Sequence, residues 1–100
     1  MASVIVEYTF AEPKSDDELS RMAARLDQCL EIRNGAWVRS SLSADRKRMI
    51  CEFEAPDADS VREALRAAGQ SFDRVWPATV FAVESYPEPM AKLARVRGKQ

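Results

Sequence analysis

The stretch RMICEFEAPD, residues 48–57, places a cysteine next to two glutamates in a strand-like alternation. A cysteine in this setting can be a nucleophile, a metal ligand or a small apolar part of the core. The alternation puts Cys51 on the same face as Phe53 and on the opposite face from Glu52, because successive strand side chains point to opposite faces. Free cysteine is among the most buried residue types, so we expect Cys51, and likewise Cys29, to be structural.

Histidine is absent from all 100 residues of the sequence. Histidine is the usual general base and a preferred ligand for zinc, copper and nickel, so its absence excludes Ser-His, Cys-His and His-based metal sites within this chain. We therefore predict no metal site and no cofactor. The two cysteines cannot form a disulfide framework, which favours a reducing, cytoplasmic location.

Four side chains are the candidate ligand-binding set: Glu7, Trp37, Arg39 and Glu52. The alternation predicts that all four lie on one face of a sheet, where Glu7 and Arg39 would fix polar groups of a small organic ligand and Trp37 would form an apolar wall. In the alternative function, Glu7 or Glu52 is the general base of a cofactor-independent enzyme. The sequence leaves both functions open.

The element pattern that must position these residues is β-α-β-β-α-β. Ser15 and Glu18 fit a capping box at the start of the first helix, and Asn34-Gly35 is typical of its end. This order predicts an α+β, ferredoxin-like fold, with a four-stranded antiparallel sheet and two helices on one face. The predicted strands are 3–10, 36–43, 48–55 and 72–85, and the predicted helices are 16–33 and 58–68.

Two helices can cover only one face of the sheet. The other face combines apolar with charged side chains, and its apolar members are costly to leave in water. We therefore expect a homodimer formed through the open sheet face, as in dimeric α+β barrels, with a solvated face and a cross-strand salt bridge as the alternative. The residues assigned to this face are Ile5, Glu7, Trp37, Arg39, Ile50 and Glu52.

The sequence divides into a domain, residues 1–85, and a proline-punctuated basic tail, residues 86–100. Met90, Leu93 and Val96 in the tail suggest one weak helical turn against a partner. A basic nucleic-acid arm is another alternative for the tail, but a disordered, solvated terminus is the stronger expectation. The formal net charge of −1 gives no field that would attract nucleic acid or anionic lipid. We therefore predict no nucleic-acid partner and no membrane association. The basic residues of the tail are Lys92, Arg95, Arg97 and Lys99.

Three short motifs resemble a small bacterial family of uncharacterised ferredoxin-like proteins, one class of which binds nickel. The first is Val6-Glu7 with Thr9-Phe10, and the second is Cys51 followed by Glu-Ala-Pro-Asp at 54–57. The third comprises helix residues between 61 and 69, with Asp-Arg-Val at 73–75 beyond it. The resemblance spans residues 4–76 and implies the ferredoxin-like fold and a dimer. Ala64 stands where the family usually has histidine, so nickel binding through that position is not expected here.

Overall fold

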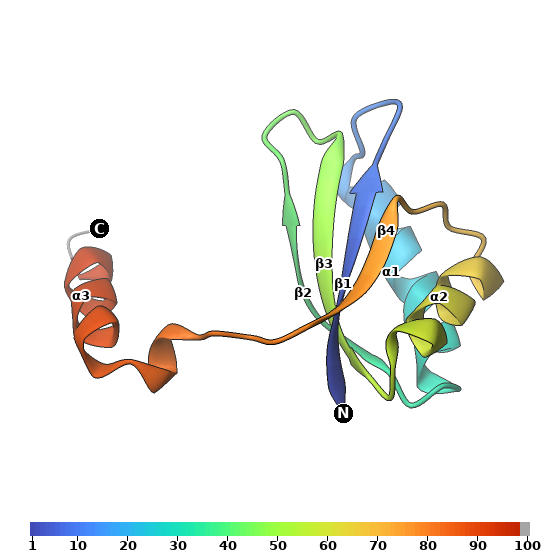
Figure 1. Ribbon diagram of the computed structural model, residues 1–100. Coiled ribbons are helices and arrows are strands. Elements are labelled where there is room, and N and C mark those ends of the chain that lie inside the picture. Colours follow the sequence, from blue (N-terminus) through green and yellow to red (C-terminus); the bar gives the residue numbers. More distant parts are fainter. Residues whose placement is uncertain (99–100) are drawn as a thin grey trace.

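The computed structural model describes residues 1–98 and contains one four-stranded antiparallel sheet with strand order β2-β3-β1-β4. Helices α1 and α2 cover one face of this sheet and leave the other face open (Figure 1). The order of the elements confirms the predicted α+β, ferredoxin-like fold. The strands are β1 (Ala2–Thr9), β2 (Ala36–Leu42), β3 (Arg48–Ala55) and β4 (Arg74–Ala78), and the helices are α1 (Asp16–Glu31), α2 (Ala58–Ala67), the short η1 (Val83–Ser85) and α3 (Pro87–Arg97).

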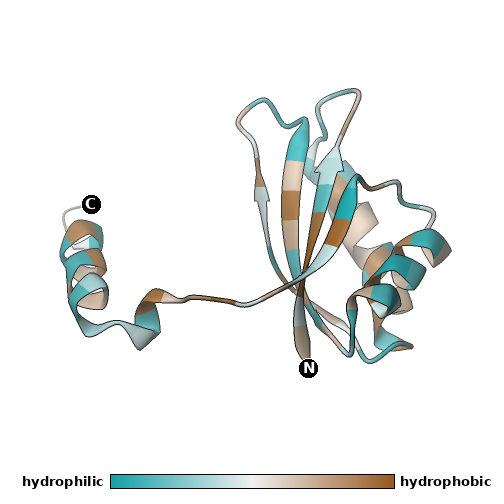
Figure 2. Ribbon diagram, viewed as in Figure 1, coloured by the Kyte–Doolittle hydropathy of each residue, from teal (hydrophilic) through white to brown (hydrophobic). Residues whose placement is uncertain are grey.

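The hydrophobic core lies between the sheet and the two helices. Alternate residues of β1 and β3 point into it. Figure 2 shows hydrophobic residues along both central strands. Leu26 and Leu30 are four residues apart and therefore lie on the same side of α1, where they pack against these strand residues. The fully buried side chains of greatest volume are Phe53, Leu30, Leu65, Val4, Val6 and Val61.

The helix ends follow local signals in the sequence. Ser15 and Glu18 form the predicted capping box, with each side chain bonded to the other residue's backbone amide. Helix α1 ends at Glu31, two residues before the predicted end. Asn34, with φ of 58°, takes the left-handed conformation that glycine more often supplies. Gly35 instead lies close to Leu30, since an added Cβ would approach that side chain to 3.1 Å.

A break in the register of β2 changes which side chains face the core. Trp37 pairs with Phe53, but Arg39 pairs with Glu52, so Val38 is an extra residue on β2. Trp37 therefore lies on the helix-covered face with Phe53, whereas Arg39 lies on the open face. The prediction that Trp37 and Arg39 share a face is wrong, because it assumed uninterrupted alternation. Val38, predicted to face the core, is exposed.

Strand β4 is shorter than the predicted strand 72–85. Its pairing with β1 ends at Ser3 and Ala78. Pro77, the residue before the last in β4, has no amide hydrogen to donate to a neighbouring strand. Strand β4 lies at the edge of the sheet, a position that tolerates a proline.

Residues 79–98, called the arm from here on, leave the sheet on the side opposite α1 and α2 (Figure 1). The arm contains η1 and α3, and α3 is an 11-residue helix where a single weak turn or a disordered terminus was expected. Lys99, part of the predicted basic tail, lies outside the described residues. No helix within residues 1–98 combines the length and hydropathy needed to cross a membrane.

Candidate functional site

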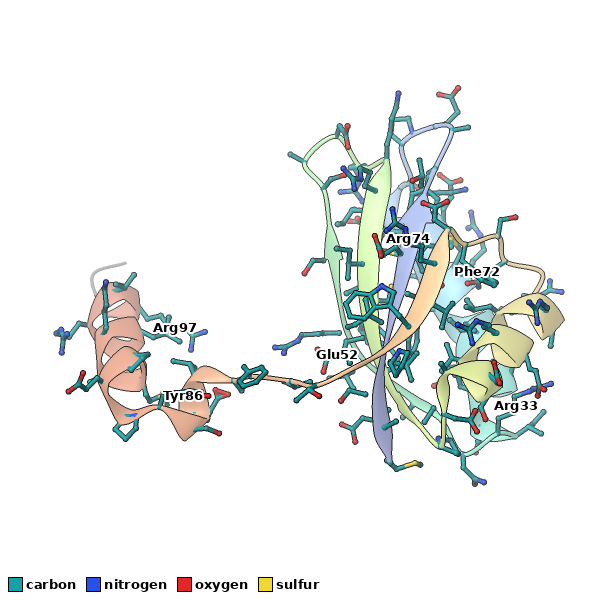
Figure 3. All side chains as sticks on the ribbon, in the orientation of Figure 1. Arg33, Glu52, Phe72, Arg74, Tyr86 and Arg97 are labelled. Atoms are coloured by element: carbon teal, nitrogen blue, oxygen red, sulfur yellow. The ribbon has the colours of Figure 1, made fainter. Side chains whose placement is uncertain are left out.

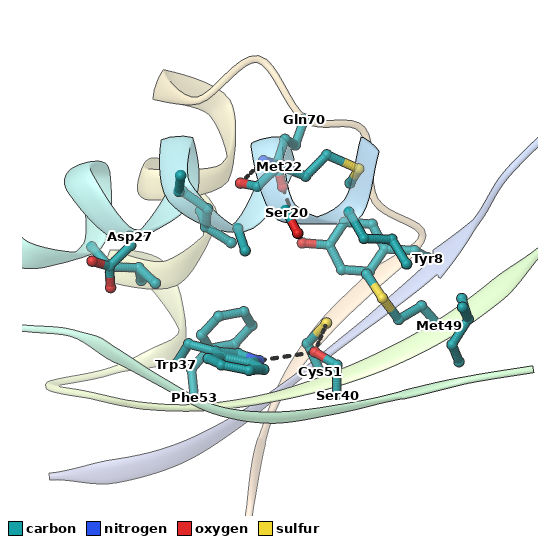
Figure 4. Close-up of a pocket in the computed structure, with 16 residues that line it drawn as sticks. Tyr8, Ser20, Met22, Asp27, Trp37, Ser40, Met49, Cys51, Phe53 and Gln70 are labelled. Atoms are coloured by element: carbon teal, nitrogen blue, oxygen red, sulfur yellow. Dashed lines mark hydrogen bonds between the residues drawn. The ribbon is translucent and has the colours of Figure 1, made fainter. Parts of the chain in front are cut away.

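A groove of about 610 Å³ lies between α1 and the strands β2 and β3 (Figure 4). Its floor is formed by core side chains, and Trp37, 53% exposed, forms one wall. The register break in β2 creates this wall, since it turns Trp37 toward α1. Most of the lining is apolar and comprises Leu19, Met22, Ala23, Ala24, Leu26, Leu30, Trp37, Leu42, Met49 and Phe53.

A short chain of hydrogen bonds runs along the strand side of the groove. The indole Nε1 of Trp37 donates to Ser40 Oγ at 2.9 Å, and the Ser40 hydroxyl donates to Cys51 Sγ at 2.8 Å. These contacts fix the orientation of the Trp37 ring and leave its face available to the groove. A flat apolar surface with its polar edge already satisfied is well suited to packing against an aromatic or aliphatic ligand.

A second polar pair lies on the opposite side of the groove. The Tyr8 hydroxyl donates to Gln70 Oε1 at 3.3 Å, and Gln70 Nε2 donates to the backbone carbonyl of Met22 at 2.8 Å. Burial, together with the nearby Cys51, raises the pKa of Tyr8 well above its ordinary value of 10.0. Tyr8 therefore remains a neutral hydroxyl at physiological pH, and it joins β1 to the loop after α2.

Cys51 lies on the floor of the groove and is only 4% exposed. Burial raises the pKa of its thiol above 9.0, and the hydrogen bond from Ser40 lowers it by a smaller amount. A thiol with a raised pKa is protonated at neutral pH and is a poor nucleophile. The structure thus places Cys51 in the core, as the alternation predicted, and gives it no activating neighbour. Cys29 is half-buried at the edge of the same core.

We expect Cys51→Ala to lower the free energy of unfolding by about 1 kcal/mol, because it leaves a small cavity and removes the acceptor of the Ser40 hydroxyl. Urea denaturation of both proteins measures this change. Cys51→Ser, which keeps a polar group there, is the comparison. Rapid labelling of Cys51 by a thiol reagent in the native wild type at neutral pH would contradict the structural role.

The other predicted ligand residues lie on the open face of the sheet. Glu7 Oε2 accepts a hydrogen bond from the Trp76 indole at 2.9 Å, and Arg39 forms an ion pair with Glu52 at 3.1 Å. Figure 3 shows Glu52 on the side of the sheet away from the helices. The structure therefore brings Glu7, Arg39 and Glu52 to one face, as predicted, and places Trp37 on the other. A smaller hollow of about 390 Å³ lies beside Glu7.

Sequence reasoning did not identify the groove as a site. Tyr8, Met22 and Gln70 are far apart in the sequence, and nothing in their local patterns indicates that they meet. The one available signal was the strand from residue 36 to 42, whose alternation of apolar residues is irregular at Trp37-Val38. Three consecutive apolar residues, Ala36-Trp37-Val38, are compatible with a bulge, but they do not determine one.

The topology and the groove define a small ferredoxin-like α+β protein. One face of its sheet is open, and the face covered by helices carries the groove between α1, β2 and β3. The chain belongs to the SCO4226-like family, described as nickel-responsive proteins, whose model matches residues 5–77. Among solved structures, SCO4226 from Streptomyces coelicolor A3(2) matches with a TM-score of 0.74 and 16% identity, covering 81% of this chain and 100% of that chain. At this identity the likeness establishes the fold alone. A search of curated proteins finds no significant match.

The residues of this chain do not fit a nickel site. No group of three or more Cys, Asp or Glu residues that would hold a metal ion occurs within residues 1–98, and histidine is absent from the sequence. Ala64, where the resemblance places the family's histidine, is fully buried against the sheet. Cys51 and Glu52 point to opposite faces, so neighbouring thiolate and carboxylate cannot share one ion.

We expect no saturable nickel binding by the tag-free protein. Titration calorimetry with NiCl₂ measures this directly, and a histidine tag must be absent because it supplies imidazole ligands. Binding at one ion per subunit that is lost in Cys51→Ser would show that the thiol is a ligand and would overturn this prediction.

Proposed function

We propose that this protein is a homodimeric module that binds a small, neutral, mostly apolar molecule in the groove between α1 and the strands β2 and β3. The observation that carries the proposal is the half-exposed Trp37 ring, which is held by Ser40 and faces the groove volume of about 610 Å³. That volume falls within the usual range for small-molecule sites, which is about 300 to 1,000 Å³.

The lining of the groove supports a neutral ligand. No lysine or arginine is among the described residues that line it, so the groove offers no counter-ion for an anionic ligand. Among the residues 1–98 that line the groove, Asp27 is the only carboxylate, and it is exposed. Ser20, Ser40 and Tyr8 supply hydroxyl groups that can orient one or two polar atoms of an otherwise apolar molecule.

Trp37 provides a direct test. The chain has two tryptophans, and Trp76 lies on the open face, so Trp76→Phe leaves Trp37 as the single indole reporter at the groove. We expect Nile red, a neutral apolar dye, to quench Trp37 emission saturably and with one site per subunit. The absence of saturable quenching, with dye fluorescence also unchanged, would contradict the groove as a binding site.

The dimer part of the proposal rests on the open sheet face. Ile50 is 50% exposed and Trp76 is 42% exposed there, next to the half-buried Ile5. Ile5 is directly opposite Trp76 on β4. Ile50 is opposite Glu7 on β1 and is therefore diagonal to Ile5 on the same face. A second copy packed on this face would remove these side chains from water.

Two free cysteines suit a reducing compartment, and we accordingly place this function in the cytoplasm.

The alternative function is a cofactor-independent enzyme in which Glu7 is the general base. The hollow of about 390 Å³ beside Glu7 is the observation that favours it. However, Glu7 already accepts the Trp76 indole hydrogen and Glu52 already binds Arg39, so each carboxylate is engaged within the sheet. We therefore prefer the binding function, in which these contacts hold the open face in a fixed shape.

A further inference from the structure

The arm, residues 79–98, does not pack on the domain from which it extends. Within the described chain, α3 contacts η1 and no other helix or strand. Figure 3 shows Tyr86 and Arg97 on the arm, clear of the side chains of the domain. The family match ends at residue 77, just before the arm begins, so the arm is an addition to the part that this chain shares with its family.

The arm carries exposed apolar side chains that its own fold leaves without cover. Phe81 is 80% exposed, and Val80, Tyr86 and Met90 are each more than 40% exposed. Isolated helices shorter than about 12 to 15 residues are marginal in water, because nucleation is costly and few hydrogen bonds follow it. An 11-residue helix that contacts only η1 therefore needs a further surface to remain folded.

The geometry of the chain indicates where that surface is. The arm leaves the sheet on the side opposite α1 and α2, which is the side on which Ile50 and Trp76 are exposed (Figure 1). Any second copy that covers this open face must lie on the same side as the arm. The apolar residues at the start of the arm, Val80 and Phe81, follow β4 directly and so come within reach of such a copy.

We propose that the arm packs against the open sheet face of a second copy of this chain, with Phe81 as its principal apolar contact. This inference rests on the proposed homodimer and adds to it an exchange of arms. It accounts for both the exposed apolar residues of the arm and the open sheet face, because each copy supplies an arm and receives one. It also gives α3 the neighbouring surface that its own domain does not provide.

Photo-crosslinking of the full-length chain tests this arrangement. p-Benzoyl-phenylalanine is introduced at Phe81, where 80% exposure allows the substitution without disturbing the core. We expect irradiation at micromolar concentration to give a covalent dimer. Tandem mass spectrometry should locate the link within β3 residues 49–55 of the partner's tryptic peptide 49–62, which contains Ile50. The matched control carries the same group at Ile32, which is also 80% exposed but follows α1 on the helix side. This control should give no covalent dimer.

The outcomes separate the arm from the dimer. Sedimentation equilibrium of the unmodified protein first establishes whether it is a dimer. If the protein is a dimer, three results would overturn the exchanged arm and leave the dimer intact. The group at Phe81 could link only within its own chain, link to α1 or α2 of the partner, or fail to react. A protein that sediments as a monomer would contradict the proposed dimer and the arm with it. Phe81→Ser should weaken the dimer at least tenfold if the arm contributes as proposed, and an unchanged dissociation constant would contradict it.

Discussion

Replacing Ala23 by tryptophan should weaken binding of a neutral apolar dye at least tenfold. Ala23 is exposed on α1 and lines the groove, so a larger side chain there extends into the space opposite Trp37. We expect at least a tenfold loss of affinity for Nile red in Ala23→Trp, because the indole occupies volume that the dye requires. Dye fluorescence at increasing protein concentration measures the effect.

The matched control for this substitution is Gln28→Trp. Gln28 is exposed on the same helix but is not among the residues that line the groove. Both substitutions place tryptophan at an exposed helical position. The loss of helix propensity is larger for Ala23→Trp but stays below about 0.7 kcal/mol. Affinity should therefore be unchanged in Gln28→Trp. Equal loss in both variants would mean that the dye binds elsewhere or that the helix has been disturbed.

Replacing Ile50 by aspartate should dissociate the proposed dimer into monomers. Ile50 lies near the middle of the open face, where it pairs with Glu7 of β1 and Ser41 of β2. A carboxylate in a buried contact loses hydration without gaining a partner, which costs about 2 kcal/mol or more in protein mutational data. This corresponds to a dissociation constant raised roughly 30-fold. Sedimentation equilibrium across a range of concentrations measures the shift.

Trp37→Glu is the informative comparison for the dimer. The register break in β2 places Trp37 in the groove rather than on the open face, so this charge should leave the dimer intact while weakening dye binding. Ile50→Asp should do the reverse. If Trp37→Glu dissociated the protein and Ile50→Asp did not, the two surfaces would have exchanged roles and the proposed interface would be wrong.

The local parts of the fold could be predicted because local chemistry determines them. Strand β3 begins and ends at the predicted residues 48 and 55, since alternation is regular there and Pro56-Asp57 follows. Ser15 and Glu18 specified the start of α1 because a capping box needs only four residues. Gly69, with φ of 71°, ends α2 as expected of glycine at that position.

The extent of β4 and the form of the arm could not be predicted in this way. The apolar residues after Ala78 continue a strand-like pattern, but a strand requires a pairing partner, and the ladder with β1 ends at Ser3. The helix α3 has a proline at its first position, where the fixed backbone angle of proline favours a helix start. Its length depends on surroundings that a short sequence pattern does not describe.

The ferredoxin-like order, the burial of Cys51 and the lack of imidazole ligands could be predicted because each follows from residue type and local spacing. The face on which Trp37 lies and the existence of the groove depend on contacts between distant elements. One extra residue in β2 turns the residues before it to the opposite face of the sheet. The alternation of apolar and polar residues cannot show where this extra residue lies, because its position is defined only by the pairing with β3. The groove then forms because Tyr8, Met22 and Gln70 come together across distant elements, through contacts made only once α1 packs on the sheet.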